Sequence, residues 1–256
     1  MEFEIVRGNI AKISADAIVL PANTKLLEGS GASAAIFEAA GREKLTAACR
    51  SIGSCEVGKA VPTPAFSLEA DYIIHAVTPV WNGGNSGEYD LLSSAYLSSL
   101  ALADVMSCAS IAFPLLASGN NGFDLELAFD IATNSIQLFE GQNLQKVFLV
   151  IHGDHIASIV KNKGFSLVTE PTPIRNAVST ALRNQAGPNA WGALQQFVAG
   201  QIHKGVAWLK EDENQKMLLN AGKKIALWVL GTVLEKKKSL PAPLKILGEE
   251  IIKNKK

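Results

Sequence analysis

The chain has 256 residues, of which 48% are hydrophobic and 19% charged, so it can build a sizeable core and is not wholly disordered. Its net charge is zero, but residues 1–164 carry 10 Lys and Arg against 17 Asp and Glu, whereas residues 165–256 carry 14 against 7. Binding a polyanion needs a basic face. No nucleic acid is therefore predicted as the partner of the acidic first part.

Strand and helix patterns alternate from the N-terminus onward. Short apolar runs bounded by turn residues predict strands at 3–6, 16–20, 59–63, 71–77, 110–116 and 147–151. Apolar residues at helical spacing predict helices at 33–41, 43–49, 88–106 and 124–139. Pro62 and Pro64 place the third strand at a sheet edge or at a strand end, and Asp124 is suited to cap the last helix. Strands that alternate with helices predict an α/β layered fold.

Two glycine-bearing loops join a strand to a helix, at residues 28–33 and 117–123. A loop that opens a helix is suited to bind an anion, because free backbone N–H groups and the positive end of the helix dipole point into it. In an open α/β sheet, ligands bind beyond the carboxyl ends of the strands. Two such loops facing one crevice would hold a ligand with two anionic or hydroxyl-rich parts.

The first loop also fits a dinucleotide fingerprint. Gly29 to Ala34 match G-x-G-x-x-A, which predicts a Rossmann-type oxidoreductase that binds NAD. However, about eight residues separate Leu20, where the strand ends, from the first glycine. The region some twenty residues further on is helix-like and holds Cys49 and Arg50, where that fold places an acidic residue after a second strand. This interpretation is kept as an alternative.

A series of short motifs favours another fold. DAIVLPAN (16–23), LLEGSG (26–31), AAIFEAAG (34–41), YIIHAVTP (72–79) and IAFP (111–114) follow one another, and Ser118, Gly119, Gly122 and Phe123 complete the series. In content and order they resemble the macrodomain family, the ADP-ribose-binding fold, over about residues 3–160. The family's motifs are D-A-I-V-N-A-A-N, L-L-G-G-G-G, G-A-I-x-x-A-A-G, Y-V-I-H-x-V-G-P and I-A-F-P, followed by an S-[ST]-G loop and a closing G-[FY].

The resemblance implies a mixed central sheet sandwiched between helices, and a crevice for ADP-ribose or an ADP-ribosylated protein. The loop at 28–33 would hold the pyrophosphate with backbone N–H groups, and the loop at 117–123 would close over the phosphates. Asn23 would hydrogen-bond the distal ribose, or else serve only as a turn residue. The implied ligand-binding residues are Asn9, Ile10, Asn23, Gly29, Ser30, Gly31, Ala32, Ser33, Ser118, Gly119, Asn120, Asn121, Gly122 and Phe123.

Departures from the family pattern bear on function. Asn9 replaces an Asp that accepts from the adenine amino group, and Leu20 replaces the first Asn of N-A-A-N. Ser33 stands where hydrolytic members carry Asp, and its hydroxyl is better suited to cap the following helix than to act as a base. Ala117 replaces a serine, and Asn121 replaces an aromatic that shields the distal ribose.

These departures predict a protein that binds ADP-ribose or ADP-ribosylated targets without efficient turnover, with no catalytic residue assigned. The enzyme alternative is an ADP-ribosyl or O-acetyl-ADP-ribose hydrolase with a non-standard base, which would use a different route through Glu28, Asn121 or Asp124. A third hypothesis is an interaction protein whose pocket has lost its ligand. No cofactor and no metal ion are expected.

Other polar residues carry weaker signals. His75 lies in an apolar strand and is predicted to be a core histidine, while His152 and His155 either line the crevice or form a polar turn. Trp81 either covers the site or packs. The three cysteines form no C-x-x-C pair and are predicted to be reduced thiols. Without a signal-like N-terminus, the protein is expected to be soluble and cytoplasmic.

The last third of the chain matches no macrodomain motif. We predict a macrodomain at 1–164, a Pro- and Gly-bearing linker at 165–188, in which 174–184 could form a short helix, and an α-helical region at 189–256. The helical region has apolar stripes in 189–209 and 217–234 and a last helix at 244–252. The favoured interpretation is that these helices pack on themselves or on the macrodomain. Lysines such as Lys223, Lys224 and Lys236 suggest the alternative, a protein-interaction module or a basic membrane-surface module.

Overall fold

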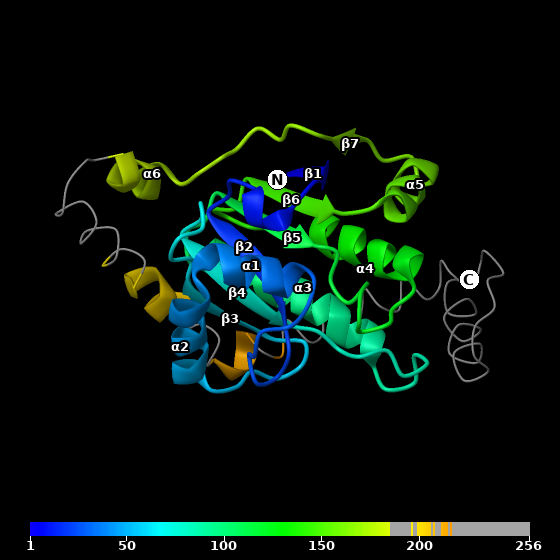
Figure 1. Cartoon of the computed structure of the whole chain (residues 1–256), viewed down its shortest axis with the longest axis horizontal. Coiled ribbons are helices and arrows are strands. Elements are labelled where there is room, and N and C mark those ends of the chain that lie inside the picture. Colours follow the sequence, from blue (N-terminus) through cyan, green and yellow to red (C-terminus); the bar gives the residue numbers. More distant parts are fainter. Residues whose placement is uncertain (185–195, 197–198, 206, 208–210, 215, 217–256) are drawn as a thin grey trace.

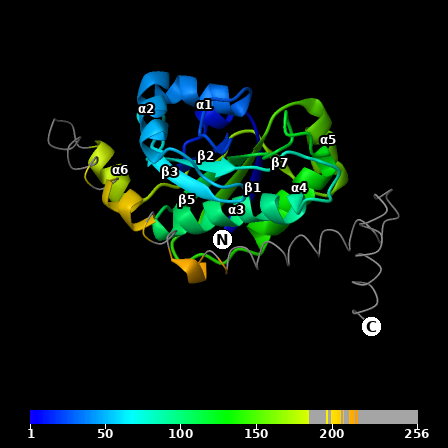
Figure 2. The ribbon, with the colours of Figure 1, turned by 90° about the horizontal axis from the view of Figure 1, so that it is seen from below.

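The structure, a computed structural model, describes residues 1–184, 196, 199–205, 207, 211–214 and 216. A seven-stranded sheet lies between two layers of helices (Figures 1 and 2). The strands are β1 (Glu2–Arg7), β2 (Ala17–Ala22), β3 (Ala60–Pro64), β4 (Tyr72–Val77), β5 (Ser110–Pro114), β6 (Lys146–Ile151) and β7 (Leu167–Val168). The helices are α1 (Ala32–Ala40), α2 (Arg42–Ile52), α3 (Glu88–Val105), α4 (Leu125–Gln137), α5 (Asp154–Asn162) and α6 (Ala177–Asn184), with a short 3-10 helix, η1 (Ile10–Lys12).

The strand order is β3-β4-β2-β5-β6-β1-β7, and every neighbouring pair is parallel except β3 with β4. The mixed sheet confirms the predicted fold class for the described residues. All residues of β4, β5 and β6 are buried, because helices cover both faces of the sheet. One core cluster joins the sheet to α1 and α2, and the other joins it to α3, α4 and α5. Figure 2 shows α1 and α2 on one side of the sheet, with α3 and α4 on the other.

The edge position predicted for the third strand is confirmed. The N–H of Val77 donates to the carbonyl of Lys59, and the N–H of Ala65 donates to the carbonyl of Asp71, so the backbone N–H and C=O groups of the odd-numbered residues in this segment point to β4. The backbone groups of Pro62 and Pro64 therefore point away from the sheet, where proline offers no N–H to an added strand. The prolines protect this edge of the sheet against pairing with another chain.

The structure also corrects the prediction at the end of the sixth strand. The segment that contains His155 was expected to be a polar turn or part of the crevice, but Asp154 begins helix α5. Ile156, Ile159 and Val160 pack toward the core at helical spacing, and Ile156 and Val160 are buried. The helical signal was present but short, and the polar His-Gly-Asp-His sequence in front of it concealed it.

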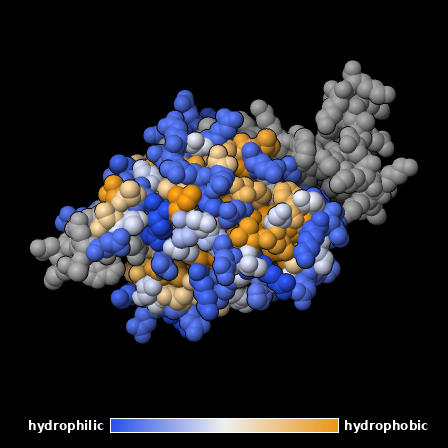
Figure 3. Space-filling view, turned by 90° about the horizontal axis from the view of Figure 1, so that it is seen from above, coloured by the Kyte–Doolittle hydropathy of each residue, from blue (hydrophilic) through white to orange (hydrophobic). Residues whose placement is uncertain are grey.

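Few large hydrophobic side chains are exposed among the described residues, and they are dispersed along the chain: Met1, Leu27, Ile52, Val80, Leu138 and Val178. From the side that carries β7, apolar residues form patches set among hydrophilic ones (Figure 3). In the described part of the chain, no helix is both long enough and apolar enough to span a membrane.

Part of the predicted helical region lies on the domain. Residues 199–205 are helical. Ile202 packs against the core, and a Cβ on Gly205 would lie 2.7 Å from Cδ1 of Leu102 in α3. A Cβ there would press against the side-chain ends of Leu102 and Met106, so the glycine lets this segment lie close to α3. The predicted apolar stripe at 217–234, the helix at 244–252 and the lysine-rich segments lie outside the described residues.

Candidate functional site

A cavity of about 480 Å³ opens at the carboxyl ends of β2, β4 and β5. The segments that follow these three strands form most of its wall, and the start of α1 closes one side. The described lining residues are Pro21, Ala22, Asn23, Thr24, Gly29, Ser30, Gly31, Ala32, Ser33, Val57, Val77, Thr78, Val80, Leu115, Ala117, Ser118, Gly119, Asn120 and Asn121. None of these described residues is ionisable, so the site offers neutral hydrogen-bonding groups and apolar walls.

Asn23 forms the turn that leads out of β2. Its Oδ1 accepts from the N–H groups of Lys25 and Leu27, each at 3.1 Å, and its Nδ2 donates to the carbonyl of Leu27 at 2.8 Å. The same residue lines the cavity. The turn role is therefore observed, and it places the amide of Asn23 at the mouth of the cavity.

The first glycine loop ends at the start of α1. Gly31 precedes the helix with a φ of +60°, a conformation that favours glycine, and no side chain caps the helix. The prediction that Ser33 is the N-cap is wrong, because Ser33 lies inside the helix and its Oγ accepts from the N–H of Gly29 at 3.0 Å. The first N–H groups of a helix have no intrahelical acceptor. Those of α1 lie at the cavity wall, where an anion can accept from them.

The second glycine loop is tied to the first across the cavity. The Nδ2 of Asn120 donates to Oγ of Ser30 at 2.8 Å, which bridges two loops that are 90 positions apart in sequence. Ala117 has a φ of +61°, uncommon for a residue with a side chain. The Oγ of Ser118 donates to the carbonyl of Leu115. These contacts define the loop as a turn that folds back toward α1.

Asn121 connects the second loop to the end of β4. Its Nδ2 donates to Oγ1 of Thr78 and to the carbonyl of Pro79, both at 2.9 Å, and its own carbonyl accepts from the N–H of Trp81. Trp81 packs against Phe123, with ring centroids 5.0 Å apart. Of the two roles considered for Trp81, the structure shows the packing role.

Four of the residues implied as ligand-binding do not line this cavity. The Oδ1 of Asn9 accepts from the N–H of Ala11 at 3.0 Å, at the start of η1, and Ile10 is buried beneath it. Gly122 donates its N–H to the second loop's own backbone, and Phe123 packs behind that loop. A second lone pair on the amide oxygen of Asn9 is still able to accept from a ligand beside η1.

The candidate bases have other partners. Glu28 binds Nε of Arg42 with both oxygens, at 2.8 and 3.0 Å. Asp124 accepts from the N–H of Leu127 and caps α4, as predicted. His75 is a core histidine: burial lowers its pKa to about 4, and its Nε2 lies 2.9 Å from Oγ1 of Thr63. Within the described residues, no cluster of His, Cys, Asp and Glu is arranged to hold a metal ion.

Nine lining residues were not among the predicted binding residues: Pro21, Ala22, Thr24, Val57, Val77, Thr78, Val80, Leu115 and Ala117. All of them except Val57 lie at or just after the ends of predicted strands, which is the signal that sequence analysis left unused. Val57 reaches the cavity through the contact of its loop with the turn after β2, where the N–H of Cys55 donates to the carbonyl of Thr24. No sequence pattern indicates that contact.

Comparison with known proteins agrees with this geometry. The family model for the macro domain matches residues 19–132. A macro domain-containing protein of Chlorobaculum tepidum is 42% identical over 151 residues, which cover 58% of this chain and 87% of the relative. An O-acetyl-ADP-ribose deacetylase of Salmonella gallinarum is 41% identical over 140 residues, which cover 53% of this chain and 78% of the relative.

Solved structures lead to the same family. A mutant of the Oceanobacillus iheyensis macrodomain with ADPR matches with a TM-score of 0.59 and 33% identity, covering 63% of this chain and 90% of that one. The chain therefore belongs to the macrodomain family, as the motifs predicted. This assignment excludes the alternative of a Rossmann-type fold. More than a third of the chain lies outside the matches to these three proteins.

Proposed function

We propose that this macrodomain binds ADP-ribose, free or attached to a protein, in the cavity at the carboxyl ends of β2, β4 and β5, without efficient turnover. The observation that carries the proposal is the composition of the cavity. Two glycine loops and the start of a helix surround it, and none of its described lining residues is ionisable. The relatives named for O-acetyl-ADP-ribose and ADPR support the choice of ligand.

Binding would rest on the backbone of the first loop. A pyrophosphate at the start of α1 accepts from the N–H groups of Gly31, Ala32 and Ser33, and hydrogen bonds to a charged group each contribute about 1.5–3 kcal/mol. The Ser33 hydroxyl holds the N–H of Gly29 and so keeps the loop in shape. Asn23, at the mouth, has one Nδ2 hydrogen left to donate to a ribose hydroxyl, because its Oδ1 already accepts from two backbone N–H groups.

The absence of turnover is proposed because the described cavity wall lacks a group to activate water. A serine hydroxyl at position 33 is no base near neutral pH. Glu28 is paired with Arg42, and Asp124 caps a helix. Neither carboxylate is among the described residues that line the cavity.

A second candidate function is hydrolysis of an O-acetyl-ADP-ribose or ADP-ribosyl bond. One specific observation favours it, the 41% identity to a protein named as an O-acetyl-ADP-ribose deacetylase. The nucleophile would then be a water whose proton is taken by a substrate group or by a residue outside the described cavity wall.

Isothermal titration of the full chain with ADP-ribose, NAD and ADP tests the proposal. Micromolar binding of ADP-ribose, about −8 kcal/mol, is the expected result. The variant Ala32→Glu places a carboxylate at the first position of α1, where it favours the helix but repels a phosphate. It should weaken ADP-ribose binding at least about tenfold, a change of about 1.4 kcal/mol in binding free energy.

Ala47→Glu is the matched control, because Ala47 is exposed on α2 and does not line the cavity. Equal affinity in both variants, or no binding by the natural chain, would contradict the proposal. Turnover is measured separately by chromatography of O-acetyl-ADP-ribose with excess enzyme. Product formation that disappears in Asn23→Ala would replace the binding proposal with the hydrolase.

A further inference from the structure

The three strands that end at the cavity begin at a second polar site. Asp16 precedes β2, Asp71 precedes β4, and Ser110 is the first residue of β5. Both aspartates are nearly inaccessible to solvent, with exposed fractions of 0% and 3%. Six residues of parallel strand span about 20 Å, so this site and the cavity lie at opposite ends of the same strands.

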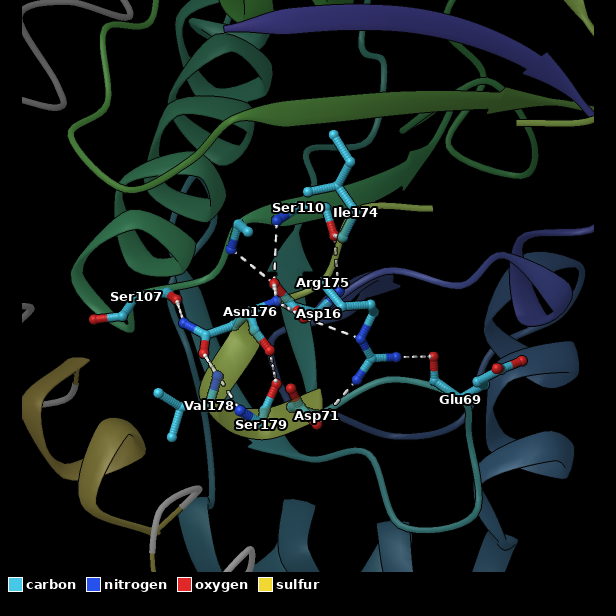
Figure 4. Close-up of polar contacts among 11 residues, drawn as sticks. Asp16, Glu69, Asp71, Ser107, Ser110, Ile174, Arg175, Asn176, Val178 and Ser179 are labelled. Carbon is cyan, nitrogen blue, oxygen red and sulfur yellow. Dashed lines mark hydrogen bonds and ion pairs between the residues drawn. The ribbon is translucent and has the colours of Figure 1, made fainter. Parts of the chain in front are cut away.

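A segment from beyond the residues that match the macro domain family model fills this second site (Figure 4). The guanidinium of Arg175 lies between the two aspartates, with Nε 3.0 Å from Oδ1 of Asp16 and Nη2 3.1 Å from Oδ1 of Asp71. Its Nη1 donates to the carbonyl of Glu69 at 2.8 Å. All three nitrogens of the guanidinium thus have an acceptor, a fit that an ammonium group does not reproduce.

The neighbouring residue Asn176 completes the contact. Its backbone N–H donates to both oxygens of Asp16, at 2.8 and 2.9 Å, and its Nδ2 donates to the carbonyl of Ser107 at 2.6 Å. Its Oδ1 accepts from the N–H of Val178 at 2.9 Å, so the same side chain caps α6. The hydroxyl of Ser110 donates to the carbonyl of Ile174. Helix α6 therefore starts from the docking contact itself.

Charge explains why the occupant matters. Burial raises the pKa of Asp16, and the N–H groups of Asn176 and Ala109, together with the charge of Arg175, act in the opposite direction. Two buried carboxylates without a cation would be strongly unfavourable. The segment supplies that cation. Strand β7, which precedes Arg175 by a few residues, pairs with β1 and so ties the segment to the sheet close to the site.

We propose that the amino ends of β2, β4 and β5 form a guanidinium-docking site whose occupant is the chain's own segment 174–184, anchored by Arg175. The segment is then an integral element of the domain rather than part of a free linker, and residues 199–205 pack on the domain beyond it. It lies at the amino ends of these strands, opposite the end that carries the cavity. This proposal does not depend on the function of the cavity.

Hydrogen exchange of the full chain tests the proposal without any ligand. In Arg175→Met, amides of residues 169–184 should exchange about tenfold faster or more, while the cavity loops 23–33 and 117–123 keep their protection. The matched control is Arg7→Met, which removes an arginine paired with Asp154 at the surface. The control should leave segment 169–184 protected. Unchanged protection of that segment in Arg175→Met, or equal loss in the control, would overturn the proposal.

Thermal unfolding at two pH values separates docking from general packing. In Arg175→Met the melting temperature should fall by about 5 °C or more near pH 8 and by less near pH 5, because burial raises the pKa of Asp16 and loss of the Arg175 cation raises it further, so the unpaired carboxylate is relieved by protonation as the pH falls. The ionisable groups that face the site are Asp16, Asp71, Arg175 and Cys108, and burial keeps the pKa of the Cys108 thiol well above its ordinary value, so this thiol stays neutral at both pH values.

If Arg175→Met is unfolded throughout, Arg175→Lys decides the matter by hydrogen exchange. A lysine keeps the charge but not the three-way geometry, so loss of protection confined to residues 169–184 supports docking. Uniform loss over the whole sheet, or none, contradicts it. A loss of stability that does not vary between the two pH values also contradicts it.

Discussion

The two ends of β2, β4 and β5 use polar residues in opposite ways. At the carboxyl ends, a hollow is lined by amides, hydroxyls and helix-start N–H groups, with no ionisable side chain among the described residues. At the amino ends, two buried carboxylates are enclosed by donors from Arg175, Asn176 and the start of β5. A site that keeps donors available can receive a ligand, whereas a site whose charges are matched within the chain contributes to the fold.

The largest effect is expected from removing a buried charge at the amino ends of the strands. Asp16→Ala deletes the acceptor of the N–H groups of Ala109 and Asn176 and leaves Arg175 with one carboxylate, so it should destabilise the fold by about 3–5 kcal/mol. Urea unfolding measures the loss. Asp154→Ala, which breaks a surface pair, should change stability by at most about 1 kcal/mol. Equal effects of the two substitutions would mean that the amino ends are not a special site.

A buried carboxylate near the other end provides a smaller effect. Glu88 accepts from the N–H groups of Asn82, Gly84 and Ser86, at 3.0, 3.1 and 2.5 Å. Burial acts to raise its pKa, but these N–H groups outweigh burial and hold the pKa below the ordinary value. A lowered pKa stabilises the fold above the unfolded-state pKa, and this stabilisation is lost as the pH falls through the folded-state value.

Glu88→Gln should therefore destabilise the protein by about 1–3 kcal/mol at neutral pH and by less near pH 3. Urea unfolding at both pH values is the measurement. A difference that grows as the pH falls would refute the assigned contacts. The result would show that this carboxylate, although it lies near the cavity end, is neutralised by backbone N–H groups of the preceding loop and does not serve a ligand.

The smallest expected effect concerns the bridge between the two cavity loops. Asn120→Ala removes the hydrogen bond to Ser30, an exposed contact that contributes about 1 kcal/mol or less to closing the mouth. On the proposed function, ADP-ribose should associate up to about fivefold faster, with the melting temperature unchanged. Stopped-flow binding measures the rate. Ser30→Ala should have the same effect and add nothing in the double variant, whereas additive effects would exclude the bridge.

Much of the fold was predictable because its signals are local. Apolar runs indicated the six main strands, and helical spacing indicated α1 to α4. Both glycine loops and Asn23 meet at one cavity, as expected from the rule that ligands bind beyond the carboxyl ends of strands. The short elements α5 and β7 were missed, since nine and two residues carry little periodic signal.

The roles of single polar side chains were less predictable. Ser33 was predicted to cap the helix, but its Oγ accepts from the N–H of Gly29. Asn121 was interpreted as the replacement of an aromatic residue, but its side chain connects the second loop to Thr78 at the end of β4. Either residue has several local partners within reach, and only the position of distant segments selects among them. The linker predicted at 165–188 rested on its prolines and glycine, and nothing in that composition indicates where Arg175 binds.

Local sequence patterns predict the α/β class, the order of the main elements and the macrodomain motifs, because hydrophobic period and turn residues act over a few positions. Which polar groups face the cavity and which pair within the fold depends on how distant segments come together in the tertiary structure. Asp16 and Arg175 are 159 positions apart, and their contact exists because the sheet brings the amino ends of three strands together. Because both groups are buried, the contact is important for stability, since a charge removed from water destabilises the fold unless it has a partner.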